Sequence, residues 1–278
     1  MSIKGIYDIH CHIVPGVDDG ATDIGETVKL LRMEYEQGVR TVIATPHFRF
    51  RMFETPAEKV REQFRLVEKA ASEISPDLHV YLGCEFHANM EMLPMLREQK
   101  VMTMAGSRYV LTEFSHNSEE SYIRERLGAL LSGGYKPIMA HIERYEATRN
   151  SLDFVEELAD MGVYMQINAD SITGKDGFFT KRYCNKIMIS FLNYEKILEK
   201  DMYAWYEKTT HMCCAFFYDI TQIFYIVLAG QEKQIIEADE SVTQSIRKIQ
   251  LFIRRHEDYW KDHVKQKIEL EHRLEAML

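Results

Sequence analysis

The chain has 278 residues, of which 46% are hydrophobic and 28% are charged, and its formal net charge is -9 at pH 7. This length and composition suit one large globular domain, and an α/β barrel of this size is common. The acidic balance argues against a general nucleic-acid-binding protein, which would usually present a basic face.

The five cysteines are an odd number and form no CxxC pair, so we expect reduced thiols in a cytoplasmic protein. The N-terminal segment reaches Asp8 without the apolar run of a signal peptide. Residues 211–230 form a long apolar segment, but Asp219 interrupts it near its middle. A central aspartate costs about 3 kcal/mol on membrane-insertion scales, so we expect a buried strand with its flanks there and no membrane span.

Short apolar runs alternate with segments of helical periodicity over the first part of the chain. The predicted strands are Ile6–Ile9, Thr41–Ala44, Val80–Gly83, Tyr109–Thr112, Pro137–Ala140 and Val163–Asn168. The predicted helices are Ile24–Gln37, Pro56–Ile74, Met90–Gln99, Glu119–Leu131 and Leu152–Met161. Such alternation with short connections predicts parallel strands joined by crossover helices. The number of units favours an α/β barrel over the alternative, a doubly wound open sheet.

The pattern changes after about residue 181. Residues Tyr183–Lys200 are predicted to be helical, and the aromatic-rich stretch that follows has no clear period. From Asp239 onward the chain is predicted to form one long charged helix with an apolar stripe, which would pack on the body of the protein or on a second copy in a homo-oligomer. We therefore divide the chain into a barrel domain, residues 1–230, and a C-terminal helix, residues 231–278.

Side chains that can bind metals follow the predicted strands at one end. His10 and His12 are two apart at the end of the first strand, so both project to the same side, toward the mouth where barrel enzymes place their sites. The next four strands end at His47, Glu85, Glu113 and His141. A lone His-x-His could be a polar strand end, but five consecutive strands that deliver ligands to one rim indicate a metal site.

Two aspartates extend this candidate set. Asp18 and Asp19 follow the first strand in a turn closed by Gly20, and at least one could reach the same mouth, although Asp-Asp-Gly is usually only a turn. Imidazoles mixed with carboxylates suit Zn, Mn or Fe better than Ca or Mg alone. More than four ligands implies more than one ion, and clustered divalent ions can clamp the oxygens of a phosphoryl group. The sequence therefore predicts a phosphate-ester hydrolase.

Arginines lie close to these candidate ligands. Arg144 follows His141 by three residues and could bind phosphate oxygens with its guanidinium group, the alternative being a surface ion pair with Glu143. Arg49 and Arg51 follow the second strand and fit a solvated loop better.

A cysteine mechanism is not supported, because a C-x5-R pattern is required and Val17 stands at the arginine position after Cys11. Six other histidines have no partner pattern and are predicted to face solvent. They are His79, His87, His116, His256, His263 and His272.

Several motifs resemble, in order and spacing, those of the bacterial metal-dependent tyrosine-protein phosphatases of the polymerase-and-histidinol-phosphatase (PHP) superfamily, which act in capsular and exopolysaccharide synthesis. The motifs are Asp8–His12, Val17–Gly20, Gly38–Thr41, Thr45–His47, Met52–Pro56 and Ala140–Tyr145. The resemblance runs from about Tyr7 to about Met188.

The resemblance implies a distorted seven-stranded (βα)7 barrel and up to three divalent ions, Mn in the first place, with Fe or Zn as alternatives. His10, His12 and Glu85 would hold one ion, Glu85, Glu113 and His141 a second, and Asp19 and His47 would serve a third. Arg144 would bind the phosphate. The implied partner is the phosphotyrosine tail of an autophosphorylating bacterial tyrosine kinase.

The family also carries Asp-x-His at the end of its last strand, and this chain departs from that pattern. The candidate seventh strand, Ala215–Tyr218, is followed by Asp219 but by no histidine at the required spacing. Two of the three ions would each lose a ligand, so we expect activity to be reduced or absent. Two alternatives stay open, a histidinol-phosphate-type phosphatase of the same superfamily and a catalytically inactive protein that binds the kinase.

Overall fold

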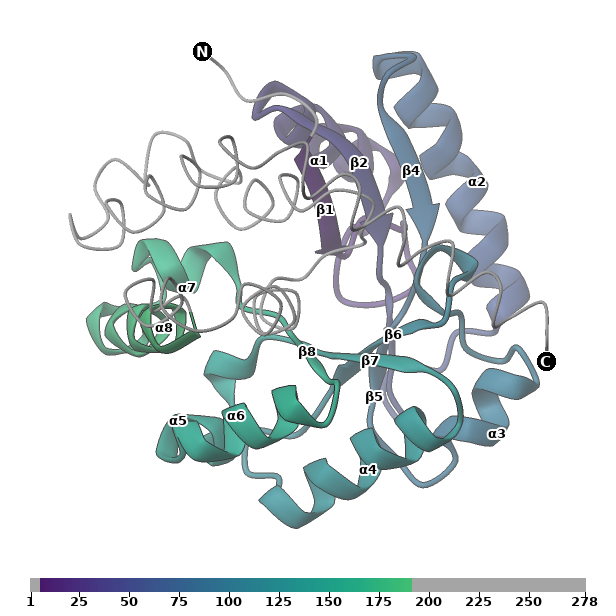
Figure 1. The fold of residues 1–278 in the computed structure, drawn as a ribbon. Helices are drawn as coiled ribbons and strands as arrows, with labels where there is room; N and C mark the ends of the chain where they lie inside the picture. Colours follow the sequence, from purple (N-terminus) through teal and green to yellow (C-terminus); the bar gives the residue numbers. More distant parts are fainter. Residues whose placement is uncertain (1–5, 192–278) are drawn as a thin grey trace, which may run out of the picture.

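The computed structural model describes residues 6–191, and the strands of this part of the chain pair in parallel in two sheets (Figure 1). The first sheet has the order β1-β2-β4 and the second the order β3-β5-β6-β7-β8. The strands are β1 (Ile6–Cys11), β2 (Val39–Ala44), β3 (His47–Phe48), β4 (His79–Leu82), β5 (Glu85–His87), β6 (Tyr109–Glu113), β7 (Lys136–Met139) and β8 (Tyr164–Met165).

The two sheets form one continuous series of strands. Two neighbouring strands of this series are each interrupted by a two-residue break at the same height. Residues 45–46 separate β2 from β3, and residues 83–84 separate β4 from β5. Backbone hydrogen bonds cross this interruption, since Gly83 N donates to Ala44 O at 2.7 Å and Glu85 N donates to Pro46 O at 3.1 Å. The spatial order of the strands therefore follows the order of the chain.

This order decides between the two predicted architectures. A doubly wound sheet contains a point at which the strand order reverses, and the strands of residues 6–191 show no such reversal. The doubly wound alternative is therefore wrong. The strands of the same residues do not close into a barrel either, so the structure shows an α/β fold with parallel sheets arranged as an arc.

Helices cover the outer side of this arc, as Figure 1 shows for α2, α3, α4 and α6. The helices are α1 (Ile24–Glu36), α2 (Ala57–Ile74), α3 (Met92–Arg97), α4 (Glu120–Ser132), α5 (Glu146–Asn150), α6 (Leu152–Asp160), α7 (Ala169–Thr173) and α8 (Phe178–Phe191), with short 3-10 helices η1 (Met104–Gly106) and η2 (Ile142–Arg144). The five helices predicted between the strands are confirmed within a few residues at their ends. The short elements η2, α5 and α7 were not predicted.

Capping explains where two of the helices begin. The side chain of Asp23 accepts a hydrogen bond from Glu26 N at 3.0 Å at the start of α1, and Ser151 Oγ accepts from Phe154 N at 3.1 Å at the start of α6. Each cap satisfies a backbone N–H group that has no partner inside its helix, which stabilises a helix by about 1 kcal/mol.

Apolar side chains fill both faces of the strands. Between helices and strands, Phe64 and Val67 of α2 share one buried cluster with Val42 of β2, and Leu127 of α4 shares another with Phe86 of β5. The concave face carries a separate cluster of Ile9, Ile43, Met104, Leu111, Ile138 and Ala140. Burial on two faces is why the strands appear in the sequence as continuous apolar runs and not as alternating ones.

Some predictions fall outside the described residues. They are the second half of the helix Tyr183–Lys200, the apolar segment of residues 211–230 with the candidate seventh strand, the long C-terminal helix and the domain boundary at residues 230–231. No helix of residues 6–191 has the length and apolar character needed to cross a membrane.

The turn after β1 passes very close to His12. Ala21 N donates to His12 O at 2.9 Å. A Cβ atom added at Gly20 would lie 2.2 Å from His12 O and 2.4 Å from His12 Cβ. The predicted Asp-Asp-Gly turn is therefore also a packing constraint on one of the candidate metal ligands.

Replacing Gly20 with alanine should destabilise the protein by about 1–3 kcal/mol, the usual cost of forcing extra atoms into a packed site. Urea denaturation gives the free energy of unfolding. The matched control is Gly128→Ala in α4, where the nearest atom to the new Cβ is Met161 Cε at 3.8 Å. This control should be neutral or stabilising by up to about 1 kcal/mol, because alanine favours the helix. Equal stability of the two variants would contradict the packing argument.

Candidate metal centre

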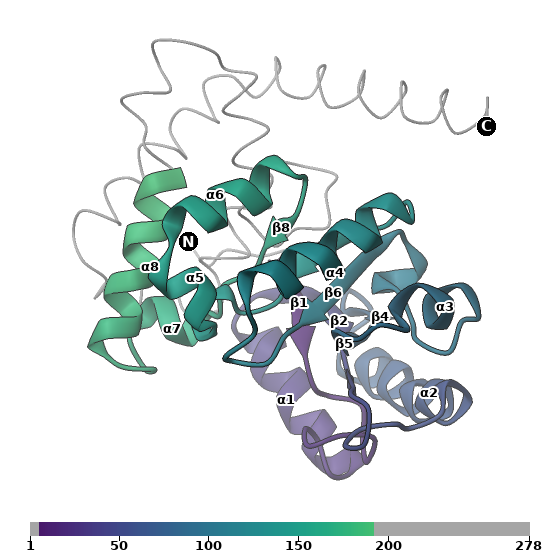
Figure 2. The same ribbon diagram turned by 90° about the horizontal axis from the view of Figure 1, so that it is seen from below.

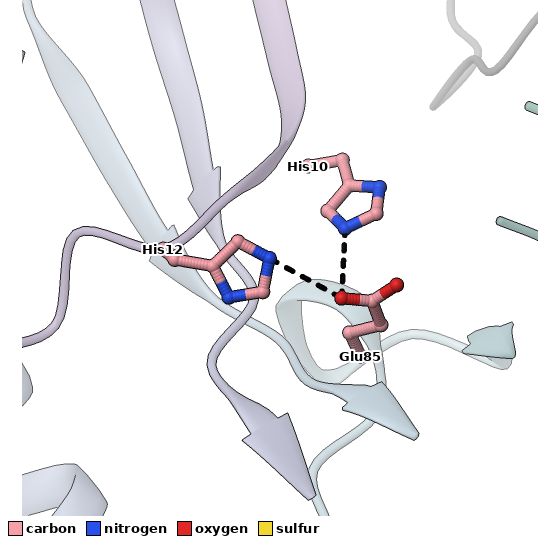
Figure 3. Close-up of side chains that lie close together, drawn as sticks. All are labelled: His10, His12 and Glu85. Carbon is pink, nitrogen blue, oxygen red and sulfur yellow. Dashed lines mark ion pairs between the residues drawn. The ribbon is translucent and has the colours of Figure 1, made fainter. Parts of the chain in front are cut away.

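Glu85 lies at the centre of a cluster of four histidines, and its side chain is only 1% exposed. Its Oε2 atom is 3.0 Å from His10 Nε2 and 3.2 Å from His12 Nε2 (Figure 3). The same oxygen is 3.2 Å from His47 Nδ1, and Oε1 is 2.7 Å from His141 Nε2. The predicted convergence of strand ends on one point is therefore present.

The interruption of the sheets sets these positions. His47 opens β3 and Glu85 opens β5, and the two residues are direct partners in the parallel pair. His10 lies in β1 and His12 directly follows it, and Figure 3 shows both imidazoles directed at the carboxylate of Glu85. Each ligand thus sits at a point where a strand ends or restarts, at the same edge of the arc.

His141 follows β7 in an unusual backbone conformation. Its φ is 30°, in the left-handed region that residues other than glycine seldom adopt. Its backbone N–H donates to Gln166 Oε1 at 2.6 Å, which helps to hold this conformation. Backbone strain of this kind is found most often at functional sites.

The two remaining candidate ligands lie at the edge of the cluster. Glu113 at the end of β6 has Oε2 3.8 Å from His47 Nδ1 and Oε1 3.9 Å from His141 Nε2. The side chain of Asp19 is 65% exposed, and its Oδ1 is 3.7 Å from His47 Nε2. All seven predicted ligands are therefore brought together.

Three sets of side chains in this cluster could each hold one ion, because the potential ligand atoms within each set lie within 4.8 Å of one another. They are His10, His12 and Glu85; His12, Asp19 and His47; and His47, Glu85 and Glu113. The first matches the set implied by the family resemblance. The third contains His47 where the resemblance placed His141, although His141 also contacts Glu85.

The burial and mutual interactions of the charged side chains in this cluster shift their pKa values. Burial opposes ionisation of Glu85, yet the charge and hydrogen bond of His10 and the hydrogen bonds of His12 and His141 hold the pKa of this carboxyl well below its usual range. Burial alone would lower the pKa of His12, but its hydrogen bonds to Asp18 and Glu85 raise it to about 10. Burial and the charge of Glu85 raise the pKa of Glu113 to about 7.

The residues fit a divalent metal cluster. His47 Nδ1 and Glu113 Oε2 are buried and lack a hydrogen-bond partner in the structure. A buried polar atom without a partner costs roughly 1–3 kcal/mol, and a cation bound by both would remove that cost. A mixed set of imidazole and carboxylate groups is also one that Zn, Mn and Fe prefer.

Three further residues contact the candidate ligands. Asp18 Oδ2 is 2.9 Å from His12 Nδ1 and accepts the His47 backbone N–H at 2.9 Å. Gln166 Oε1 is 3.1 Å from His10 Nδ1, and Tyr145 Oη is 3.2 Å from His141 Nδ1. Such partners fix the orientation of a metal-binding imidazole and are worth about 10–100-fold in metal affinity or activity.

The sequence offered partial signals for these residues. Asp18 was a candidate beside Asp19, and the structure separates the two, with Asp18 behind the histidines and Asp19 among them. Tyr145 lies in a motif used for the family resemblance but had no assigned role. Gln166 lies within the sixth predicted strand, Val163–Asn168, but directly after the observed β8, and it was not predicted because an amide is not a usual metal ligand.

His87 corrects one prediction. It was expected to face solvent, but it is half-buried and its Nε2 lies 3.3 Å from Ser115 Oγ. Burial and the charge of Arg49 lower the pKa of this imidazole to about 4. His79 and His116 are exposed as predicted. The remaining predicted solvent-facing histidines, His256, His263 and His272, lie outside the described residues.

Arg144 is exposed and lines a pocket of about 510 Å³ together with Glu113 and His141. Among the described residues no direct ion pair joins Arg144 to Glu143, although the charge of Arg144 opposes the rise that burial causes in the pKa of Glu143. Glu143 is buried and accepts hydrogen bonds from Asn168 N at 3.1 Å and Ser171 Oγ at 2.8 Å.

The two arginines after the second predicted strand differ from each other. Arg49 is half-buried and also lines the pocket, so its assignment to a solvated loop is wrong. Arg51 is exposed in a loop, as predicted.

A family model described as capsular polysaccharide synthesis, CpsB/CapC, matches residues 6–198. The chain belongs to this family. The predicted resemblance and its partial extent are confirmed, since the match ends well before the C-terminus.

Relatives of this family member are similar over the same region. Tyrosine-protein phosphatase CpsB of Streptococcus pneumoniae is 42% identical over 197 residues, which are 71% of this chain and 79% of that protein. Tyrosine-protein phosphatase YwqE of Bacillus subtilis (strain 168) is 30% identical over 183 residues, 66% of this chain and 72% of that protein.

A protein chain of known crystal structure also resembles this chain in fold. It comes from the crystal structures of YwqE from Bacillus subtilis and CpsB from Streptococcus pneumoniae, described as unique metal-dependent tyrosine phosphatases. It aligns with a TM-score of 0.61 and 31% identity, covering 64% of this chain and 72% of the solved one.

The shifted pKa values predict how the stability of metal-free protein depends on pH. Folding raises the pKa of Glu113 from 4.5 to about 7 and that of His12 from 6.5 to about 10. The stabilisation from each group is complete below its unfolded-state pKa and is lost as pH rises through its folded-state pKa. Urea denaturation of chelator-treated protein should therefore show stability falling between pH 6.5 and 9.

In the Asp18→Asn variant, the free energy of unfolding should decrease less steeply between pH 6.5 and 9, because the side chain that raises the pKa of His12 has lost its charge. A wild-type stability that is constant or rises over this range would contradict the assigned protonation.

Proposed function

We propose that this protein is a metal-dependent phosphatase that hydrolyses phosphotyrosine on a protein of capsular or exopolysaccharide synthesis. The observation that carries the proposal is the convergence of four histidines on the buried carboxylate of Glu85, next to a pocket lined by Arg144. Support also comes from the family, whose relatives are named tyrosine-protein phosphatases. The same relatives favour phosphotyrosine over histidinol phosphate as the substrate.

The candidate ligands would hold up to three divalent ions, with manganese as our first choice. They are His10, His12, Asp19, His47, Glu85, Glu113 and His141. Glu85 is the residue best placed to be shared between ions, because its two oxygens face different imidazoles. Ions bound here would lower the pKa of a coordinated water molecule toward neutrality and neutralise charge on phosphoryl oxygens.

The protein's own residues have separate tasks in this reaction. Arg144 would bind phosphate oxygens through two parallel N–H groups, and it stabilises the charge that they carry during phosphoryl transfer. Tyr145 and Gln166 keep His141 and His10 in their orientations. A tyrosyl leaving group has a pKa near 10, so the site needs no strong general acid.

We also propose a specific fold, substrate and turnover for this protein. The fold that we propose is the distorted seven-stranded barrel of the PHP superfamily, supported by strands in chain order and ligands at one edge. The substrate that we propose is the phosphotyrosine tail of a bacterial tyrosine kinase in the cytoplasm. Because the last-strand Asp-x-His is missing from the sequence, we infer a lower turnover than that of a complete site.

His141→Ala should lower phosphate release from a phosphotyrosine peptide with added manganese by more than about 100-fold, since even the partners of metal ligands are worth about 10–100-fold. The matched control is His79→Ala on β4, an exposed histidine, which should leave turnover unchanged. Unchanged turnover in His141→Ala would rule out the proposed site. Much faster hydrolysis of histidinol phosphate than of the peptide would favour the small-molecule alternative.

The metal content of purified protein tests the missing ligands. We expect fewer than three tightly bound ions per chain, with the ion at Glu85, Glu113 and His141 retained best, because two of the three sites lack a ligand. Elemental analysis after dialysis gives the number. Three tightly bound ions would show that other residues replace the Asp-x-His.

A further inference from the structure

The pocket beside the metal centre continues past the candidate ligands. Near the metal centre it is lined by Glu113 and His141, and farther along it is lined by Arg149, Asp176 and Thr180. One wall comes from η2 and α5, and the other from α7 and the start of α8. Figure 2 shows α5, α7 and α8 side by side, so these walls belong to neighbouring elements.

Arginines lie at both ends of this pocket. Arg49 and Arg144 are at the metal end, where the charge of Arg49 acts on Glu113 and that of Arg144 acts on His141. Arg149 is at the other end, and its guanidinium carbon lies 6.0 Å from the centre of the Tyr183 ring. Within residues 6–191 none of the three forms an ion pair with a carboxylate, so their N–H groups are available to a ligand.

Arg149 is exposed and lies beside the aromatic ring of Tyr183. Tyr183 Oη donates to Thr148 O at 2.6 Å, which ties α8 to the residue just before Arg149. The guanidinium group lies over the ring of Tyr183 at the outer limit of a cation–π contact.

Asp176 lies in the same pocket with the opposite charge. Its side chain is exposed, and its Oδ2 atom lies 2.5 Å from Ser171 Oγ, a hydroxyl that also contacts Glu143 Oε1 at 2.8 Å. A second anion entering this end of the pocket would be attracted by Arg149 and repelled by Asp176. The two residues therefore have opposite expected effects on the same ligand.

We propose that Arg149 binds a second anionic group of the substrate, a carboxylate or a second phosphate on a residue next to the phosphotyrosine. The inference rests on the proposed phosphatase function and deepens it by naming the substrate class. The phosphotyrosyl group occupies the metal end with Arg144, and the neighbouring anion occupies the α8 end. Arginine suits both sources, because its planar N–H groups match carboxylate and phosphate oxygens.

Three phosphotyrosine peptides of equal length test this subsite, with alanine flanks, with glutamate flanks, and with a second phosphotyrosine. Wild-type protein should prefer one or both anionic peptides over the alanine peptide in kcat/KM by about threefold to tenfold, since the pair is partly exposed. The difference should appear in KM and not in kcat, because the contact exists before and during the reaction. Preference for the glutamate peptide identifies a carboxylate, and preference for the doubly phosphorylated peptide alone identifies a phosphate.

Variants assign the preference to residues. Arg149→Gln should reduce the ratio to about one, and Asp176→Asn should increase it. The matched control is Arg65→Gln on the exposed side of α2, outside the pocket, which should keep the wild-type ratio. A wild-type ratio near one, or an unchanged ratio in Arg149→Gln, would overturn the proposal.

Binding without turnover separates this proposal from the phosphatase function. The same three sequences, made with a non-hydrolysable phosphonate in place of the phosphate ester, can be titrated by fluorescence anisotropy. A preference that depends on Arg149, in a protein that releases no phosphate, would support the anion subsite and count against the enzyme. Phosphate release with no such preference would support the enzyme and refute the subsite.

Discussion

The arrangement of the site depends on one buried carboxylate. Glu85 is almost completely shielded from water, and a buried charge is stable only when it is paired and hydrogen-bonded. Imidazoles from the ends of β1 and β7 and from the start of β3 provide this pairing. The same carboxylate is therefore both the reason that these histidines converge and the natural centre of a metal cluster.

The break in the sheets makes that convergence geometrically available. If β2 and β4 ran on without interruption, His47 and Glu85 would lie within continuous strands. Instead both residues open new short strands that pair with each other, and they meet the end of β1 at the same edge. The turn through Gly20 then fits against His12 with no space for a side chain. Local backbone geometry and ligand placement are thus the same feature of the fold.

The pocket beside the centre relates the site to its substrate. A metal cluster alone recognises any phosphoryl group, so selectivity must come from neighbouring side chains. Here Arg144 and His141 both line the pocket, and Arg149, which also lines it, lies beside the Tyr183 ring of α8. The short elements η2 and α5 carry both arginines, which gives a physical reason for the extra turns between β7 and α6.

The sequence by itself determined the parallel α/β class, the candidate ligands and the family. Strand-helix alternation and strand-end residues report local periodicity, which needs no knowledge of distant contacts. Only the tertiary structure decided that the strands form an interrupted arc, that Asp18 lies behind the histidines while Asp19 lies among them, that His87 is half-buried, and that Arg49 and Gln166 lie beside the site. These outcomes depend on packing between segments far apart in the chain, and neither residue type nor spacing encodes which neighbour a side chain meets.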